Sequence, residues 1–148
     1  MEHIRHRVGI SAPLARVYAA LSTKEGLADW WTQTIEGDAS LNGTLRFFFG
    51  GSEPGAVMQV VELEPMRQVT WRCVQGPVEW VDTTISFALK AEGDETVVLF
   101  THANWREPVE FLNHCSTKWA YFMLGIKTWL EGGAQSAFPN DRKISSWG

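Results

Sequence analysis

Residues 108–131 read PVEFLNHCSTKWAYFMLGIKTWLE. At 3.6 residues per turn, one broad face of this stretch is apolar and consists of Leu112, Cys115, Trp119, Phe122, Met123, Ile126, Trp129 and Leu130. Pro108 suits the first turn of a helix, and Gly132-Gly133 suits its end. The pattern therefore predicts a helix of about 23 residues, roughly 34 Å long, whose apolar face the rest of the chain must cover.

The sequence before this helix is mostly strand-like. Alternation of apolar and polar residues predicts a strand over residues 3–10, followed by short helices up to Ser22 and at about residues 24–31. Further strands are predicted at residues 34–39, 44–49, 56–64, 68–74, 80–90 and 96–104. The expected fold class is α+β, with a curved antiparallel sheet of about 6–7 strands wrapped around the long C-terminal helix. A sheet that grips one helix in this way tends to leave a cavity.

Composition limits the class of protein. The 148 residues are 45% hydrophobic and 20% charged, which fits one domain over residues 1–148. A net charge of -4 without a basic cluster argues against nucleic acid and against an anionic membrane surface as partners. No apolar run approaches the ~20 residues of a membrane span, and the first residues lack the apolar core of a signal peptide. A cytoplasmic protein is therefore expected, with Cys73 and Cys115 as buried free thiols.

Several short motifs stand at the joints between the predicted elements: Ile10-Ser11-Ala12-Pro13, Trp30-Trp31, residues 42–47 (NGTLRF), residues 60–65 (VVELEP) followed by Thr70-Trp71, and residues 84–89 (TISFAL) with Thr96 and His102. Their order and spacing resemble the START-like (SRPBCC, helix-grip) superfamily, and within it the bacterial homologues of the activator of the heat-shock-protein-90 ATPase. The resemblance covers nearly the whole chain and implies a single START-like helix-grip domain. Members of the superfamily bind lipids or hormones, act as polyketide cyclases or assist chaperones, so the resemblance leaves function open.

Histidines lie on faces that should point inward. His6 shares a strand face with apolar residues, His102 does the same on the last strand, and His114 lies near the start of the long helix. A buried polar group without a partner costs ~1–3 kcal/mol, so these rings need each other, water or a ligand. Each is interpreted either as a satisfied core residue or as a cavity residue that orients a ligand or acts as acid and base near neutral pH. No metal site is expected, since no carboxylate or thiol stands at ligand spacing from these histidines.

Tryptophan is abundant, with eight in the chain. These rings either wall an aromatic pocket or simply fill the core. In the first interpretation, the ligand-binding residues are predicted to be His6, His102, Trp71, Trp119, Phe122 and Met123.

The charged residues of the strands are expected on the outer face. Asp82 is placed there within the strand at residues 80–90. Cross-strand pairing of Arg46 or Arg72 with Glu62 would contribute only ~0.2–1 kcal/mol at the surface. Gln59 falls on neither face consistently, which a β-bulge would reconcile.

No reaction is indicated by the sequence. It contains no nucleophile elbow, phosphate loop, paired-cysteine metal motif or carboxylate dyad, and no cofactor is expected. The first hypothesis is a binder of a small, largely apolar ligand held between the C-terminal helix and the sheet. The alternatives are an interaction module that activates a chaperone ATPase, and a cyclase or hydrolase that uses the cavity histidines. An open apolar cavity of several hundred Å³ would favour binding or catalysis, whereas a closed core would favour the interaction module.

Overall fold

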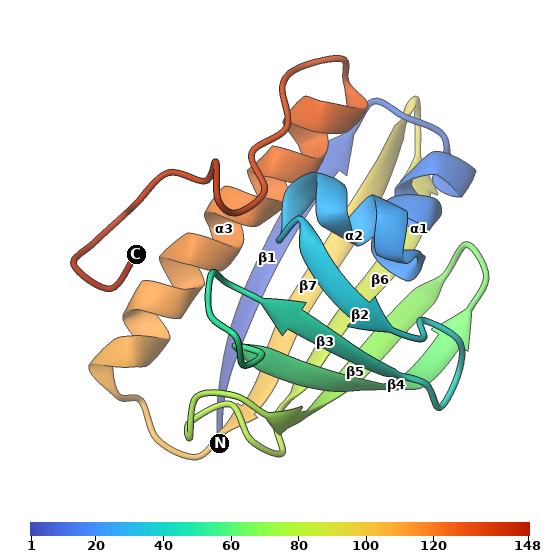
Figure 1. Ribbon diagram of the computed structural model, residues 1–148. Helices are drawn as coiled ribbons and strands as arrows, with labels where there is room; N and C mark the ends of the chain where they lie inside the picture. The colour runs from blue at the N-terminus through green and yellow to red at the C-terminus, as the bar shows by residue number, and fades with distance from the viewer.

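Seven antiparallel strands form one curved sheet, and a long helix packs against it in the computed structural model, which describes residues 1–148 (Figure 1). The strands are β1 (Glu2–Ile10), β2 (Thr34–Gly37), β3 (Thr44–Phe48), β4 (Ala56–Glu64), β5 (Gln68–Gln75), β6 (Thr84–Glu92) and β7 (Glu95–Trp105). The helices are α1 (Leu14–Ser22), α2 (Lys24–Trp30) and α3 (Glu110–Leu130). The predicted α+β class, with two short helices after the first strand and a long C-terminal helix, is confirmed.

Strand order follows the chain except at β1. The sheet runs β1-β7-β6-β5-β4-β3-β2, so strands β2 to β7 each lie beside the next one in sequence. β1 pairs with β7, with Ile4 opposite His102 and His6 opposite Phe100. The first and last strands are therefore neighbours.

The apolar face of α3 lies in the core. Its buried residues are Cys115, Trp119, Phe122, Met123, Gly125, Ile126 and Leu130. Trp30 of α2 packs edge-on against Phe87 of β6, with ring centroids 6.0 Å apart, and against Phe122 of α3 at 6.4 Å. α2 and α3 therefore share one face of the sheet. Burial of a large apolar side chain contributes roughly 1.5–3 kcal/mol, so this contact surface is what holds the helices to the sheet.

Two local predictions have different outcomes. Gln59 lies between two register irregularities in the β4–β5 pairing, one at Val57/Met58 and one at Val60/Glu62, which confirms the predicted bulge. The strand predicted at residues 80–90 instead begins at Thr84. The backbone of Asp82 has φ of 69°, a left-handed conformation that cannot continue a strand, so Asp82 lies in a turn.

Neither Arg46 nor Arg72 forms an ion pair with Glu62. Arg46 pairs with Glu36 at 3.7 Å, and Arg72 pairs with Asp82 at 2.7 Å. The Glu62 carboxylate instead accepts a hydrogen bond from the Thr70 hydroxyl. All of these groups are at least partly exposed to solvent, where an ion pair contributes ~0–1 kcal/mol.

After α3 the chain turns back along the helix (Figure 1). We call residues 131–148 the C-terminal segment. Phe138 ties it to the residues after α2, because its N–H donates to the Trp31 carbonyl and its carbonyl accepts from the Gln33 N–H. A Cβ on Gly125 would lie 2.7 Å from Ser136 Oγ, so a glycine at this position lets the segment approach the helix closely. None of the three helices has both the length and the apolar character needed to cross a membrane.

Candidate functional site: an aromatic cavity beside the long helix

A cavity of about 560 Å³ lies between α3, the C-terminal segment and the loops that follow β3 and β5. We call it the aromatic cavity, because its apolar lining is dominated by Trp31, Phe49, Trp80, Phe111, Trp119, Phe122, Phe138 and Trp147. Ala56, at the start of β4, and Cys115, on α3, also line it. The remaining wall carries Lys118, Asp141, Lys143 and His114 as its charged or titratable groups.

Trp31 links the cavity to the core. It directly follows α2 and is 2% exposed. Its ring centroid lies 5.2 Å from that of Trp119 and 5.8 Å from that of Trp71, with the Trp31 and Trp71 rings almost parallel. Phe47 approaches it to 4.4 Å. The cavity wall is therefore the outer layer of a continuous aromatic core, which fixes the orientation of the lining rings.

His102 is a fully satisfied core residue. Its Nδ1 accepts a hydrogen bond from Trp119 Nε1 at 3.1 Å, so the ring proton is on Nε2 and is donated to Thr83 Oγ1 at 2.8 Å. The Thr83 hydroxyl in turn donates to the Trp80 carbonyl at 2.6 Å. Burial lowers the pKa of His102 to about 3, so the ring is neutral near pH 7. With both nitrogens occupied, His102 positions Trp119 and Trp80 rather than exchanging protons with a ligand.

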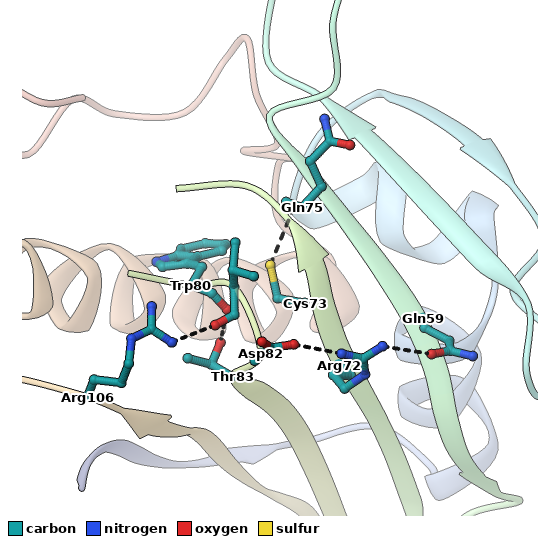
Figure 2. A network of polar contacts seen from close by, with 9 residues as sticks. Gln59, Arg72, Cys73, Gln75, Trp80, Asp82, Thr83 and Arg106 are labelled. Carbon is teal, nitrogen blue, oxygen red and sulfur yellow. Dashed lines mark hydrogen bonds and ion pairs between the residues drawn. The ribbon is translucent and has the colours of Figure 1, made fainter. Parts of the chain in front are cut away.

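The loop between β5 and β6 supplies Pro77 and Trp80 to the cavity. Two arginine side chains, Arg106 and Arg72, bind this loop (Figure 2). The Arg106 guanidinium donates to the Val78 and Val81 carbonyls at 2.6 and 2.8 Å. At the other end of the loop, Arg72 binds Asp82, as Figure 2 shows. These contacts keep Trp80 at the cavity wall, where its ring stacks on Trp119 at 5.8 Å.

Lys118 joins α3 to the C-terminal segment. Its Nζ lies 2.7 Å from Asp141 Oδ2, donates to the Arg142 carbonyl at 2.7 Å, and donates to a main-chain oxygen of Gly148, the last residue of the sequence, at 2.8 Å. The Lys118 and Asp141 side chains are only 15% and 14% exposed. All three donors of the ammonium are therefore used, and the ion pair is shielded from water more than any other in the protein.

His114 makes a second contact between helix and segment. Its Nδ1 lies 2.7 Å from Ser145 Oγ, and its ring packs against Phe111 and Trp147. Burial, and secondarily the positive charge of Lys118, lower the pKa of His114.

The cavity lacks an activated nucleophile. Burial raises the pKa of the Cys115 thiol to about 12, although the nearby Trp80 side chain opposes this shift. The thiol is therefore protonated near neutral pH. No group of three or more His, Cys, Asp or Glu side chains is arranged to hold a metal ion.

The six residues predicted from sequence occupy three kinds of place. Trp119 and Phe122 line the aromatic cavity. His102, Trp71 and Met123 are buried and do not line the cavity; Trp71 packs against Trp31, and His102 accepts a hydrogen bond from Trp119.

His6 lies apart from the aromatic cavity. Its Nε2–H donates to the Ser116 carbonyl at 3.0 Å, and its ring stacks on Phe100. The structure thus brings His6 and His102 onto adjacent strands, but not to a shared cavity wall.

Sequence reasoning missed Lys118 and the whole wall formed by the C-terminal segment. Lys118 directly precedes Trp119 of the apolar face, but a lysine beside such a face usually extends into solvent, so the local sequence does not signal its shielded partner. Nothing in the local pattern of residues 131–148 indicates that they fold back to provide that partner.

A family model and a solved structure both relate this chain to the same group of proteins. The family model described as Activator of Hsp90 ATPase homolog 1-like protein matches residues 11–131. The solution structure of the Aha1 dimer from Colwellia psychrerythraea is 41% identical, covers 90% of this chain and 98% of its own, and has a TM-score of 0.82. No match was found among curated proteins.

More distant structures share the fold alone. SSP2350 from Staphylococcus saprophyticus is 17% identical, with a TM-score of 0.76, and the match covers 92% of this chain and 97% of that one. The crystal structure of CalU16 from Micromonospora echinospora is 20% identical, with a TM-score of 0.70, and covers 96% of this chain and 76% of its own.

Proposed function

Given that this chain belongs to the family of Activator of Hsp90 ATPase homolog 1-like proteins, we propose that it binds a small, largely apolar ligand in the aromatic cavity. The observation that carries the proposal is the cavity itself. Its volume of about 560 Å³ falls in the ~300–1,000 Å³ range of small-molecule sites. Its lining is mainly aromatic, and its charged or titratable side chains come from α3 and the C-terminal segment.

The proposal favours binding over catalysis. A cyclase or hydrolase using the predicted histidines would need a ring nitrogen free to accept or donate a proton. Both nitrogens of His102 are occupied, and His6 is not at the cavity. Recognition of an apolar body by stacked rings needs no such group.

The test uses a variant that fills the cavity without altering its polar wall. Ala56 lies opposite Phe47 in the β3–β4 pairing and lines the cavity, so Ala56→Leu adds bulk there. Ala91→Leu makes the same change at an exposed position of β6 and serves as the matched control. Binding of 2-naphthamide is measured by isothermal titration calorimetry.

At ~0.3 kcal/mol for each of its roughly 13 non-hydrogen atoms, 2-naphthamide should bind with Kd near or below about 1 mM. Ala56→Leu should weaken this affinity at least about tenfold, whereas Ala91→Leu should leave it unchanged. Absence of binding to the unmodified protein, or equal binding to both variants, would contradict the proposal.

A second candidate function is interaction with a chaperone ATPase. It is favoured by the description of the matching family and by the 41% identity to the Colwellia Aha1 protein. This function would use the outer surface rather than the cavity, so the two candidates are tested separately.

A further inference from the structure

The outer face of the sheet has no helix packed against it. All three helices lie on the inward face, together with the core (Figure 1). At the centre of the outer face, the side chains of Ser86, Ala88 and Thr101 are short and uncharged, and Leu99 beside them is 38% exposed. This face is therefore a free surface on which another molecule could lie.

Two rows of paired residues cross this face, and each has a cation at one end and a carboxylate at the other. The first row crosses five neighbouring strands, from Arg5 on β1 through Thr101, Ser86 and Thr70 to Glu62 on β4. The second row runs beside it, from Arg7 through Leu99, Ala88 and Gln68 to Glu64. Neither row has a charge between its ends. The face is therefore positive along its β1 edge and negative along its β4 edge.

The end charges of the first row have no ionic partner within the chain. Arg5 is exposed and forms no ion pair. Glu62 is exposed and accepts a hydrogen bond from the Thr70 hydroxyl, but it forms no ion pair either. The end charges of the second row already pair locally, Arg7 with Glu92 and Glu64 with Arg67. The first row therefore carries the charges that are free to pair with a partner.

A two-fold axis parallel to β6 makes this face complementary to itself. β6 is the middle one of the five strands, and neighbouring strands are ~4.8 Å apart, so Arg5 and Glu62 lie about 10 Å on either side of it. In a second copy rotated by 180° about this axis, Glu62 of the partner subunit faces Arg5, and Ser86 faces its own counterpart. Opposite charges then meet at both edges of the face.

The sizes of the side chains also suit two curved sheets. The outer face of a curved sheet is convex, so two such faces approach most closely at their centres and diverge toward their edges. The central residues Ser86 and Thr101 are short, whereas Arg5 and Glu62 at the edges are long enough to cross a wider gap. Short side chains thus lie where the two faces are closest, and long charged ones where they are farther apart.

We propose that two copies of this chain form a symmetric dimer through the outer face of the sheet, in which Arg5 of each subunit pairs with Glu62 of the partner subunit. A face about 19 Å wide, the span of five strands, buries less than the ~800 Å² per partner of a standard interface, so the dimer should be weak. It uses the side of the sheet opposite the aromatic cavity and does not depend on a ligand there.

Exchange of the two charges tests this pairing. Sedimentation equilibrium at low ionic strength, from about 10 μM to 1 mM protein, compares the unmodified protein with Arg5→Glu, Glu62→Arg and the double variant. Each single change places like charges opposite one another at both edges and should weaken dimerisation at least about tenfold. The double variant restores opposite charges and should dimerise about as well as the unmodified protein.

Two exposed positions away from this face supply controls with the same change of net charge. Arg16→Glu on α1 matches Arg5→Glu, and Asp94→Arg in the β6–β7 turn matches Glu62→Arg. Both controls should dimerise like the unmodified protein. Circular dichroism checks that every variant is folded, which is expected because all four side chains are exposed.

Mixing the two single variants gives an independent readout. Arg5→Glu has carboxylates at both ends of the first row, and Glu62→Arg has cations at both ends. They should therefore form a heterodimer with each other, although neither pairs well with itself. Damage to the fold by either substitution would not be reversed by mixing.

Three results would overturn the proposal. The first is an unmodified protein that stays monomeric up to about 1 mM, because even a weak interface of this kind should then be populated. The second is a dimer that neither single charge change weakens, which would place the contact on another surface. The third is dimerisation that is lost in the single variants and regained neither in the double variant nor in the mixture.

Discussion

Replacement of Trp119 by alanine tests how α3 and the cavity wall are held together. The Trp119 side chain is 2% exposed, and its ring lies 4.7 Å from that of Phe100 and 5.2 Å from that of Trp31. Removing a buried tryptophan typically costs ~3–5 kcal/mol through lost contacts and the space left behind. We therefore expect Trp119→Ala to lower the free energy of unfolding by about that amount.

Trp119→Phe separates packing from hydrogen bonding. This variant keeps an aromatic ring but removes the N–H that donates to His102 Nδ1, leaving a buried acceptor unpaired. The expected cost is ~1–3 kcal/mol, smaller than that of the alanine variant. Urea denaturation followed by circular dichroism gives both values, provided that the slopes with denaturant agree.

Asp82→Asn is the surface control for both variants. Its side chain is 69% exposed, and asparagine tolerates the same left-handed backbone, so the loss should stay below ~1 kcal/mol. A loss below ~1 kcal/mol for Trp119→Ala would refute the placement of this ring in the core. A phenylalanine variant as stable as the unmodified protein would refute the role of the bond to His102.

Two further predictions follow from burial and from surface charge. His102 has its pKa lowered from 6.5 to about 3, so between these values the unfolded chain binds a proton that the folded chain excludes. The contribution of His102 to the free energy of unfolding is therefore complete above about pH 6.5 and is lost as the pH falls toward 3, at up to ~1.4 kcal/mol per pH unit. Urea denaturation at pH values from about 7 to 5 should show this decline. A free energy of unfolding that does not change with pH would contradict it. The purified protein should not raise the ATPase rate of a heat-shock-protein-90 homologue from the same cell, because a single domain with a net charge of -4 offers no evident second surface for contact with the chaperone. A saturable stimulation would instead favour the second candidate function.

The fold could be predicted because its main signals are local. The apolar face of residues 108–131 needs no knowledge of distant residues, and the alternation in residues 3–10 identifies a strand in the same way. The error at Asp82 also has a local cause. Alternation of side chains does not report φ, so a residue in a left-handed turn can continue an apparent strand pattern.

The site was only partly predictable because it depends on contacts between distant parts of the chain. Trp119 and Phe122 were found since they belong to the helix pattern. The inward face of β7 did identify His102 as buried, but not that Trp119 and Thr83 occupy both of its nitrogens. The pairing of Lys118 with Asp141 requires the C-terminal segment to turn back, which no periodicity in the sequence records.

We propose that the aromatic cavity holds a small molecule in the cell. Native mass spectrometry of the protein purified from its own cells tests this directly, with Ala56→Leu as the filled-cavity variant and Ala91→Leu as its control. A small-molecule adduct is expected on the unmodified protein and on Ala91→Leu, with a much smaller amount on Ala56→Leu. Unmodified protein without any adduct, or equal adducts on all three proteins, would contradict it.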